Sequence, residues 1–184
     1  MLMKTMSQQR GVGLVEILVA LLILALGVLG FVALQYRAIE ASSESTYRVQ
    51  AVNIARDLAE RIRVNRGGVG EYVCEFRNAD TSITCPAEQA IATQATLRAF
   101  ARNCIEENCN STEMADFDVA QVAVKAETIG MTVNMLPCQG NVNERQCIYV
   151  AWNDTSATNG DGADDCTNGA AYNANSTCLI MEVY

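Results

Sequence analysis

The stretch GVGLVEILVALLILALGVLGFVALQ, residues 11–35, decides how this chain is organised. From Val12 to Leu34 it holds 23 residues and a single charged side chain, Glu16. A helix rises about 1.5 Å per residue, so this length spans roughly 35 Å, enough to cross the hydrocarbon core of a bilayer. The sequence therefore predicts a transmembrane helix at residues 12–34.

The charges on the two sides of this span differ in sign. Residues 1–11 form a short polar leader that carries Lys4 and Arg10 and no acidic residue. From Gly67 to the end there are five basic and sixteen acidic residues. Basic residues before a span favour a cytoplasmic N-terminus, so the acidic part is predicted to lie across the membrane. An acidic surface also argues against a large nucleic-acid-binding face.

Glu16 is the feature that a simple signal anchor does not explain. A carboxylate at the centre of a membrane helix costs about 2.5–3.5 kcal/mol, and such groups are usually paired and functional. A cut between Gly11 and Val12 would create a new α-amino group four residues before Glu16, on the same helix face. That amine would neutralise the carboxylate, within one chain or between neighbours. A signal anchor that is never cut remains the alternative.

The run from Gly11 to Glu16 resembles the class III signal of type IV prepilins and secretion pseudopilins. That signal is a basic leader ending in Gly, then an apolar residue, a small residue, two aliphatic residues and Glu. The resemblance implies that a prepilin peptidase cuts after Gly11 and N-methylates Val12, and that Glu16 is the assembly glutamate. Val12 stands where major pilins usually carry Phe, which favours a minor subunit.

The segment AVNIARDLAERIRVNR, residues 51–66, resembles the V-type (PilV-like) minor pilins of type IV pili. The matching positions in the first third of the chain are Gly27, Gly30, Leu34, Gln35, Asp57, Leu58, Glu60, Arg61, Ile62, Arg63 and Asn65. The resemblance implies a structural subunit rather than an enzyme, taking part in the priming of pilus assembly and supporting twitching motility and adhesion. It implies an inner-membrane protein with its C-terminal domain in the periplasm, incorporated into the pilus.

The partners that the resemblance implies are other minor pilins, the major pilin, the prepilin peptidase and the inner-membrane assembly machinery. Two alternatives stay open at this point. A minor pseudopilin of a type II secretion system would have the same leader, helix and architecture. A signal-anchored periplasmic enzyme or binding protein would differ in lacking a cut after Gly11.

Residues 35–66 are predicted to continue the helix as an amphipathic segment. Apolar residues recur mostly every three or four positions, at Ile39, Val49, Val52, Ala55, Leu58, Ala59 and Ile62, which marks one helix face. Gly67 and Gly68 give a stop signal. Gly27 and Gly30 indicate either bending or close helix packing in the membrane.

Residues 67–184 are predicted to form a soluble α+β domain, with the pilin-like plan of a long helix packed on a small antiparallel sheet. Helices are expected from Ala87 to about Cys104 and from Asn110 to Gly130, and residues 67–86 and 153–177 read as loops. Strands are expected at residues 131–136, 147–152 and 178–184, the first two as a hairpin.

Eight cysteines, all after residue 73, predict a disulfide-stapled domain in an oxidising compartment: Cys74, Cys85, Cys104, Cys109, Cys138, Cys147, Cys166 and Cys178. The chain has no histidine and no C-x-x-C, so histidine-dependent catalytic arrangements and the usual zinc patterns are excluded. The sequence leaves the connectivity open. Sequential pairing is the working hypothesis, because each neighbouring pair brackets a predicted turn or loop.

The loop containing Asp161, Asp164 and Asp165 resembles a fragment of a calcium-binding loop. The spacing does not complete an EF-hand, so a solvated acidic turn is the favoured interpretation. No metal or cofactor is otherwise predicted, and calcium stays a secondary hypothesis.

Overall fold

A computed structural model describes residues 13–76, 85, 100–140 and 145–183. The chain divides into two compact units, Met1–Ser45 and Thr46–Tyr184. One helix, α1, runs from Leu14 to Val64 and contributes to both units. The predicted long N-terminal helix is confirmed, and the leader lies outside the described residues.

In the first unit, the residues that the structure describes begin at Gly13 and consist of the first part of α1. Every residue from Gly13 to Ser43 is exposed. The helix is continuous through Gly27 and Gly30, and a Cβ built on either glycine would meet nothing within 4 Å. Neither glycine therefore breaks the helix in this chain.

In the second unit α1 turns one face inward. Its buried residues are Ala51, Ile54, Ala55, Leu58 and Ile62, at the helical spacing that the sequence predicts. The chain continues through a short 3-10 helix, η1 (Arg66–Gly68), into α2 (Val69–Glu75). The prediction of a loop from residue 67 was therefore wrong for residues 67–75. Burial of Tyr72, Val73 and Cys74 stabilises the extra turns.

Helix α4 spans Ser111–Thr128 and confirms the predicted helix between Asn110 and Gly130. Its start is fixed by a capping box: the Asn110 side chain accepts from the N–H groups of Thr112 and Glu113, and the Glu113 side chain accepts from the Asn110 N–H. The helix predicted for residues 87–104 lies mostly outside the described residues. Its described end, residues 100–104, forms bends and a turn rather than helix.

The main sheet has three antiparallel strands in the order β1-β2-β6. They are β1 (Met131–Pro137), β2 (Gln146–Trp152) and β6 (Cys178–Val183). In the register, Val133 lies opposite Val150 and Tyr149 lies opposite Ile180. The predicted hairpin and third strand are confirmed.

A second, smaller sheet occupies most of the segment predicted to be a long loop. Its strands are β3 (Ser156–Asn159), β4 (Asp165–Asn168) and β5 (Ala171–Tyr172), with β3 and β4 parallel. The loop prediction was wrong because these strands are short and polar and show no alternation of apolar residues. They are held by contacts from elsewhere, such as the hydrogen bond from Asn134 Nδ2 to the Ala157 carbonyl, 2.8 Å.

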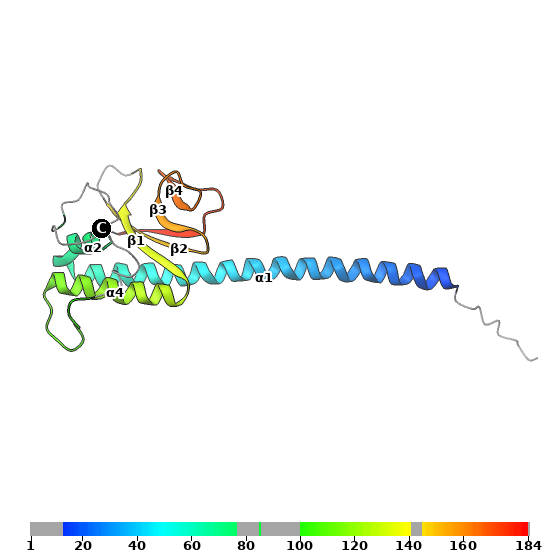
Figure 1. Ribbon diagram of the computed structural model, residues 1–184, viewed down its shortest axis with the longest axis horizontal. Coiled ribbons are helices and arrows are strands. Elements are labelled where there is room, and N and C mark those ends of the chain that lie inside the picture. The colour runs from blue at the N-terminus through cyan, green and yellow to red at the C-terminus, as the bar shows by residue number, and fades with distance from the viewer. Residues whose placement is uncertain (1–12, 77–84, 86–99, 141–144, 184) are drawn as a thin grey trace, which may run out of the picture. The chain divides into compact units, whose positions relative to one another are not determined.

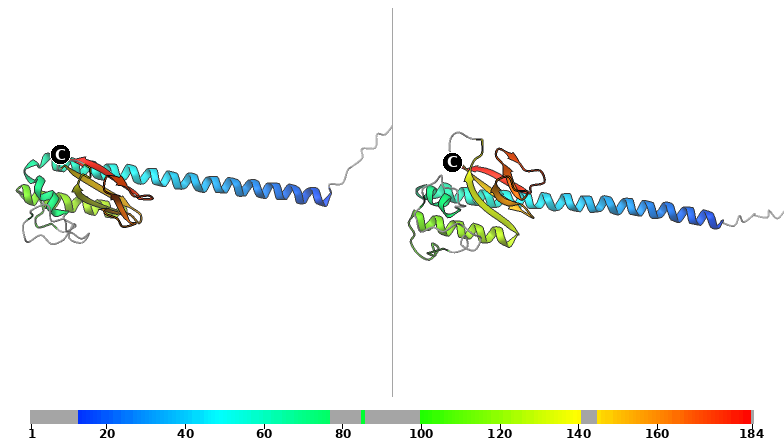
Figure 2. Two further views of the ribbon diagram at one scale, coloured as in Figure 1. Left: turned by 90° about the horizontal axis from the view of Figure 1, so that it is seen from above. Right: turned by 45° about the horizontal axis from the view of Figure 1, so that its top comes forward.

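Two apolar clusters lie on the two faces of the main sheet. The larger cluster joins α1, α2, α4 and one face of the sheet, with Trp152, Tyr72 and Phe76 among its largest side chains. The smaller cluster joins the other face to the second sheet through Tyr149, Ala157 and Cys166. Figures 1 and 2 show α4 running beside the later part of α1, with the main sheet over both helices. This is the predicted α+β fold.

Candidate assembly segment and its supporting network

The segment Leu14–Leu34 of α1 is named here the apolar segment. Leu14 is 77% exposed and Leu34 is 72% exposed, and every large apolar residue between them is also exposed. An 18-residue window of α1 has a mean hydropathy of 3.1, and none of it is buried. By length and composition this helix can cross a membrane, and as a bare surface in water it would be costly.

Glu16 lies in the first turn of α1 and is the one charged residue of the apolar segment. Its N–H group donates to the Gly13 carbonyl at 2.9 Å, so the carboxylate is carried on formed helix. Gly11 and Val12 lie outside the described residues. The cut after Gly11, the methylation of Val12 and the pairing of a new amine with Glu16 therefore remain predictions.

A polar network ties the C-terminal end of α1 to α2 and α4. Asp57 and Arg61 stand four residues apart on one face of α1, and Arg61 Nε donates to Asp57 Oδ1 at 2.8 Å. Arg61 Nη1 also donates to Asp118 Oδ1 of α4 at 2.7 Å. The Tyr72 hydroxyl of α2 donates to Asp118 Oδ2 at 2.5 Å. Lys125 of α4 donates to Asp57 Oδ2 at 2.8 Å.

Asn65, the residue after the end of α1, extends the same network. Its Nδ2 donates to the Ser111 carbonyl at the start of α4, 2.7 Å away. Gly68 lies against both groups, because a Cβ there would stand 2.6 Å from the Ser111 oxygen and 2.7 Å from Asn65 Nδ2. The glycine thus lets the chain turn closely against α4.

The network shifts the pKa values of its members. Burial alone would raise the pKa of Asp57, but hydrogen bonds from Lys125 and Arg61 outweigh burial and hold that pKa below its ordinary value. Burial also acts to lower the pKa of Arg61, and its bonds to Asp57 and Asp118 reverse this and raise it. Burial raises the pKa of Tyr72, and the bond to Asp118 raises it further. The Asp57 carboxylate is therefore held ionised, and the Tyr72 hydroxyl is held protonated.

These contacts explain the segment that resembles the V-type pilins. Asp57, Arg61 and Asn65 recur every four residues, so they share one helix face and meet α2 and α4 together. The sequence singled out Asp57, Arg61 and Asn65 only as positions of that resemblance, and it did not single out Tyr72, Asp118 or Lys125. One signal for Asp118 was available, since it is an acidic residue between Phe117 and Val119 on a helix face that is otherwise apolar.

The eight cysteines form four disulfides in the predicted sequential order: Cys74–Cys85, Cys104–Cys109, Cys138–Cys147 and Cys166–Cys178. The third closes the β1–β2 hairpin and the fourth joins β4 to β6. Cys166 is fully buried, and its bridge is part of the smaller apolar cluster.

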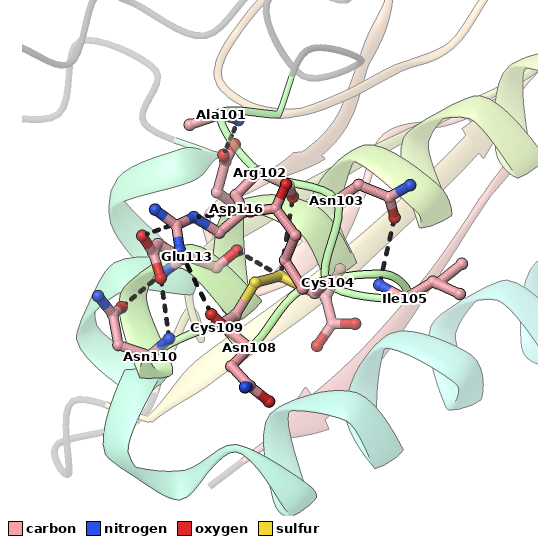
Figure 3. The surroundings of a disulfide bond; sticks show 12 residues. Ala101, Arg102, Asn103, Cys104, Ile105, Asn108, Cys109, Asn110, Glu113 and Asp116 are labelled. Carbon is pink, nitrogen blue, oxygen red and sulfur yellow. Dashed lines mark hydrogen bonds and ion pairs between the residues drawn. A yellow bond between two sulfur atoms is a disulfide. The ribbon is translucent and has the colours of Figure 1, made fainter.

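The bridge between Cys104 and Cys109 differs in lying at the surface, in front of α4 (Figure 3). Arg102 forms ion pairs with Glu107 at 3.5 Å and Glu113 at 3.2 Å. The Asn103 carbonyl accepts the N–H groups of Glu106 and Glu107. The loop is therefore held by contacts within itself and with Glu113 of α4, and its cysteines belong to neither apolar cluster.

In the acidic loop, the carboxylates of Asp164 and Asp165 accept hydrogen bonds from nearby residues of the same region. Asp165 accepts hydrogen bonds from the Thr158 hydroxyl and from the Gly162 N–H, and Asp164 accepts from Ser156 Oγ at 3.3 Å. Asp161 is exposed. Among the described residues, no group of three or more His, Cys, Asp or Glu side chains is arranged to hold a metal. Calcium binding remains a prediction, and calorimetric titration at millimolar calcium tests it.

Comparison with known proteins gives two adjoining family matches. Residues 6–32 match the prokaryotic N-terminal methylation motif, and residues 33–120 match the family described as type IV pilin Tt1218. No curated protein and no solved structure matched the chain. The two matches adjoin, and between them they cover the apolar segment and the residues of the polar network other than Lys125. These two matches support a type IV pilin.

Proposed function

We propose that this chain is a minor pilin that takes part in priming type IV pilus assembly, and so supports twitching motility and adhesion. The observation that carries the proposal is the apolar segment, an exposed helical surface from Leu14 to Leu34 with the single charge of Glu16. Such a surface is stable in lipid or against similar helices of other subunits. The methylation-motif match over residues 6–32 supports processing at the same place.

Assembly in this proposal depends on one charge pair. A prepilin peptidase cuts after Gly11 and N-methylates Val12, leaving a cationic amine beside the carboxylate of Glu16. In lipid neither charge is stable alone, so a subunit whose amine faces a neighbour's Glu16 gains a favourable contact in only one register. The pair thus selects the axial position of each subunit.

The minor role and the V-type subclass are supported by particular residues. Val12 replaces the usual Phe of major pilins, and the Asp57, Arg61 and Asn65 pattern is built into the polar network. The proposed partners are other minor pilins, the major pilin, the prepilin peptidase and the inner-membrane assembly machinery. The charge asymmetry supports an inner-membrane protein with residues 67–184 in the periplasm.

Glu16→Gln tests the proposal directly. We expect this variant to be cut after Gly11 as in the parent, yet to be nearly absent from sheared filaments, because no carboxylate meets the new amine. Glu40→Gln is the matched control, since Glu40 is an exposed α1 residue beyond the apolar segment and forms an ion pair with Arg37 three residues away. Immunoblots of membrane and filament fractions measure both variants.

Equal incorporation of Glu16→Gln and parent would contradict the assembly role, and persistence of residues 1–11 in cells would contradict processing. A minor pseudopilin would pass both tests. Deletion of the gene separates the two functions: loss of surface pili supports the minor pilin, whereas intact pili with loss of protein secretion would assign the chain to a type II secretion system.

A further inference from the structure

The apolar segment gives way to polar residues within about two turns of α1. Gln35 follows Leu34, and Arg37 and Glu40 are the first charged residues of α1 after Glu16. The helix is continuous through this change, and every residue of it from Leu14 to Ser43 is exposed. Where a helix leaves the hydrocarbon core of a bilayer, its side chains must suit both acyl chains and headgroups.

Tyr36 and Arg37 each combine an apolar part with a polar end. Tyr36 is 70% exposed and carries a hydroxyl on an aromatic ring. Tyrosine side chains concentrate at the level where acyl chains meet headgroups. The aliphatic stem of Arg37 can lie along apolar surface while its guanidinium stays in the polar layer. The pair therefore has the chemistry of a membrane boundary.

The two side chains lie on different faces of α1. Tyr36 shares its face with Val32 and Ile39, four residues before it and three after it. Arg37 shares the other face with Glu40, and Arg37 Nη1 donates to Glu40 Oε2 at 3.3 Å. A guanidinium has five N–H donors, so this contact leaves others for a phosphate oxygen. One face thus suits acyl chains and the other suits headgroups.

The length of the helix before Tyr36 matches the thickness of a bilayer. Tyr36 lies 20 residues after Glu16, which is about 30 Å along a helix. The hydrocarbon core of a typical bilayer is also about 30 Å thick. With Tyr36 at one boundary of the core, Glu16 lies at the other boundary, and Leu26, midway between them, lies at the centre.

We propose that Tyr36 and Arg37 form a lipid anchor, in which the Tyr36 ring lies at the edge of the acyl chains and the Arg37 guanidinium binds the phosphate of a phospholipid headgroup. The anchor fixes the depth of α1 in the membrane before assembly. It places the Glu16 carboxylate at the opposite boundary, where water and headgroups solvate it. The anchor requires only that the apolar segment lies in lipid.

The consequence for Glu16 rests on the proposed function. At the boundary of the core its carboxylate does not bear the full cost of burial in lipid. It leaves the polar layer only when the subunit enters the filament, where the amine of a neighbouring subunit meets it. The anchor thus keeps the carboxylate solvated until its partner is present.

Fluorescence quenching by brominated lipids measures the depth of chosen positions. The purified full-length chain is placed in vesicles of phosphatidylglycerol and dibrominated phosphatidylcholine, with the bromines near the headgroup or near the end of the acyl chain. Tyr36→Trp and Leu18→Trp should be quenched at least about twofold more by the shallow bromines, and Leu26→Trp by the deep ones. The parent, whose one tryptophan is the buried Trp152, is the control and should be quenched by neither lipid.

Phe31→Trp reports whether the two residues hold the helix in place. Adding Tyr36→Ala and Arg37→Ala should lower the ratio of shallow to deep quenching at least about twofold, because the apolar run then extends past Leu34 and the helix sinks. Arg56→Ala is the matched control. Arg56 is an exposed arginine 20 residues beyond Tyr36 in the same helix, so its loss should leave the ratio unchanged.

Solid-state NMR tests the phosphate contact. In vesicles of phosphatidylglycerol and phosphatidylethanolamine, lipid phosphorus should dephase a guanidinium carbon signal of the arginine-labelled parent. That part of the signal should be missing from Arg37→Gln. Equal dephasing in the two chains would overturn the contact between Arg37 and phosphate.

The quenching pattern separates the anchor from the proposed function. Quenching of Tyr36→Trp by neither lipid, or more strongly by the deep bromines, would overturn the anchor, as would an unchanged ratio in the double alanine variant. Stronger deep quenching of Leu18→Trp would overturn the position given to Glu16. If the chain is neither cut nor incorporated, the proposed function fails, while the quenching pattern in vesicles is unaffected.

Discussion

At the scale of single residues, Tyr72 links the fold to alkaline pH. Below its ordinary pKa of 10.0 the hydroxyl is protonated in both the folded and the unfolded chain. Because burial and Asp118 raise its pKa in the folded chain, stability is lost as pH rises above 10. We expect Tyr72→Phe to cost about 1–3 kcal/mol at neutral pH, since Asp118 loses a donor. The free energy of unfolding that this variant loses between neutral and alkaline pH should be smaller than the loss in the parent. Urea unfolding at neutral and alkaline pH measures both, and an equal alkaline loss would contradict the raised pKa.

Gly68 gives a second prediction at this scale. Its missing side chain leaves room for the Ser111 carbonyl and Asn65 Nδ2, so Gly68→Ala should destabilise the chain by about 1–3 kcal/mol through overpacking. Gly70→Ala is the matched control, because a Cβ there meets nothing within 4 Å and the residue lies within α2. It should be neutral or should stabilise by about 0.5–1 kcal/mol. Denaturant unfolding measures the stability of both variants. Equal effects would mean that Gly68 does not lie close to the Ser111 carbonyl.

At the scale of elements, the disulfides should differ in their importance. The Cys166–Cys178 bridge joins the small sheet to β6 and is buried in an apolar cluster, whereas the Cys104–Cys109 bridge closes one surface loop. Replacing both cysteines of a bridge by serine should therefore cost about 2–5 kcal/mol at 166 and 178, and clearly less at 104 and 109. Thermal unfolding under non-reducing conditions compares the two double variants. A larger loss at 104 and 109 would contradict this order.

The elements also show what a sequence can predict. Helix α4 and the three strands of the main sheet carry clear apolar periodicity or runs of β-forming residues, so they were predictable. The small sheet was not, because a strand such as SATN has no apolar pattern and forms only against residues distant in the chain. Helix α2 was not predicted, because it follows Gly67 and Gly68, and two adjacent glycines usually indicate the end of a helix. In the polar network Asp57 and Arg61 could be paired by spacing, but Asp118 lies 57 residues beyond Arg61.

At the scale of the whole molecule, the buried core residues all belong to one of the two units. Every residue of the two apolar clusters lies between Ala51 and Val183, within the unit Thr46–Tyr184. The apolar segment contributes none of them. A chain that begins at Thr46 should therefore keep its four disulfides and its cooperative unfolding, and should be found in the soluble fraction. A chain that keeps residues 14–34 should be found with membranes. Circular dichroism, thermal unfolding and fractionation test this. Loss of cooperative unfolding in the shortened chain would show that the apolar segment is also part of the folding core, and the assignment of Leu14–Leu34 to lipid and to neighbouring subunits alone would fail.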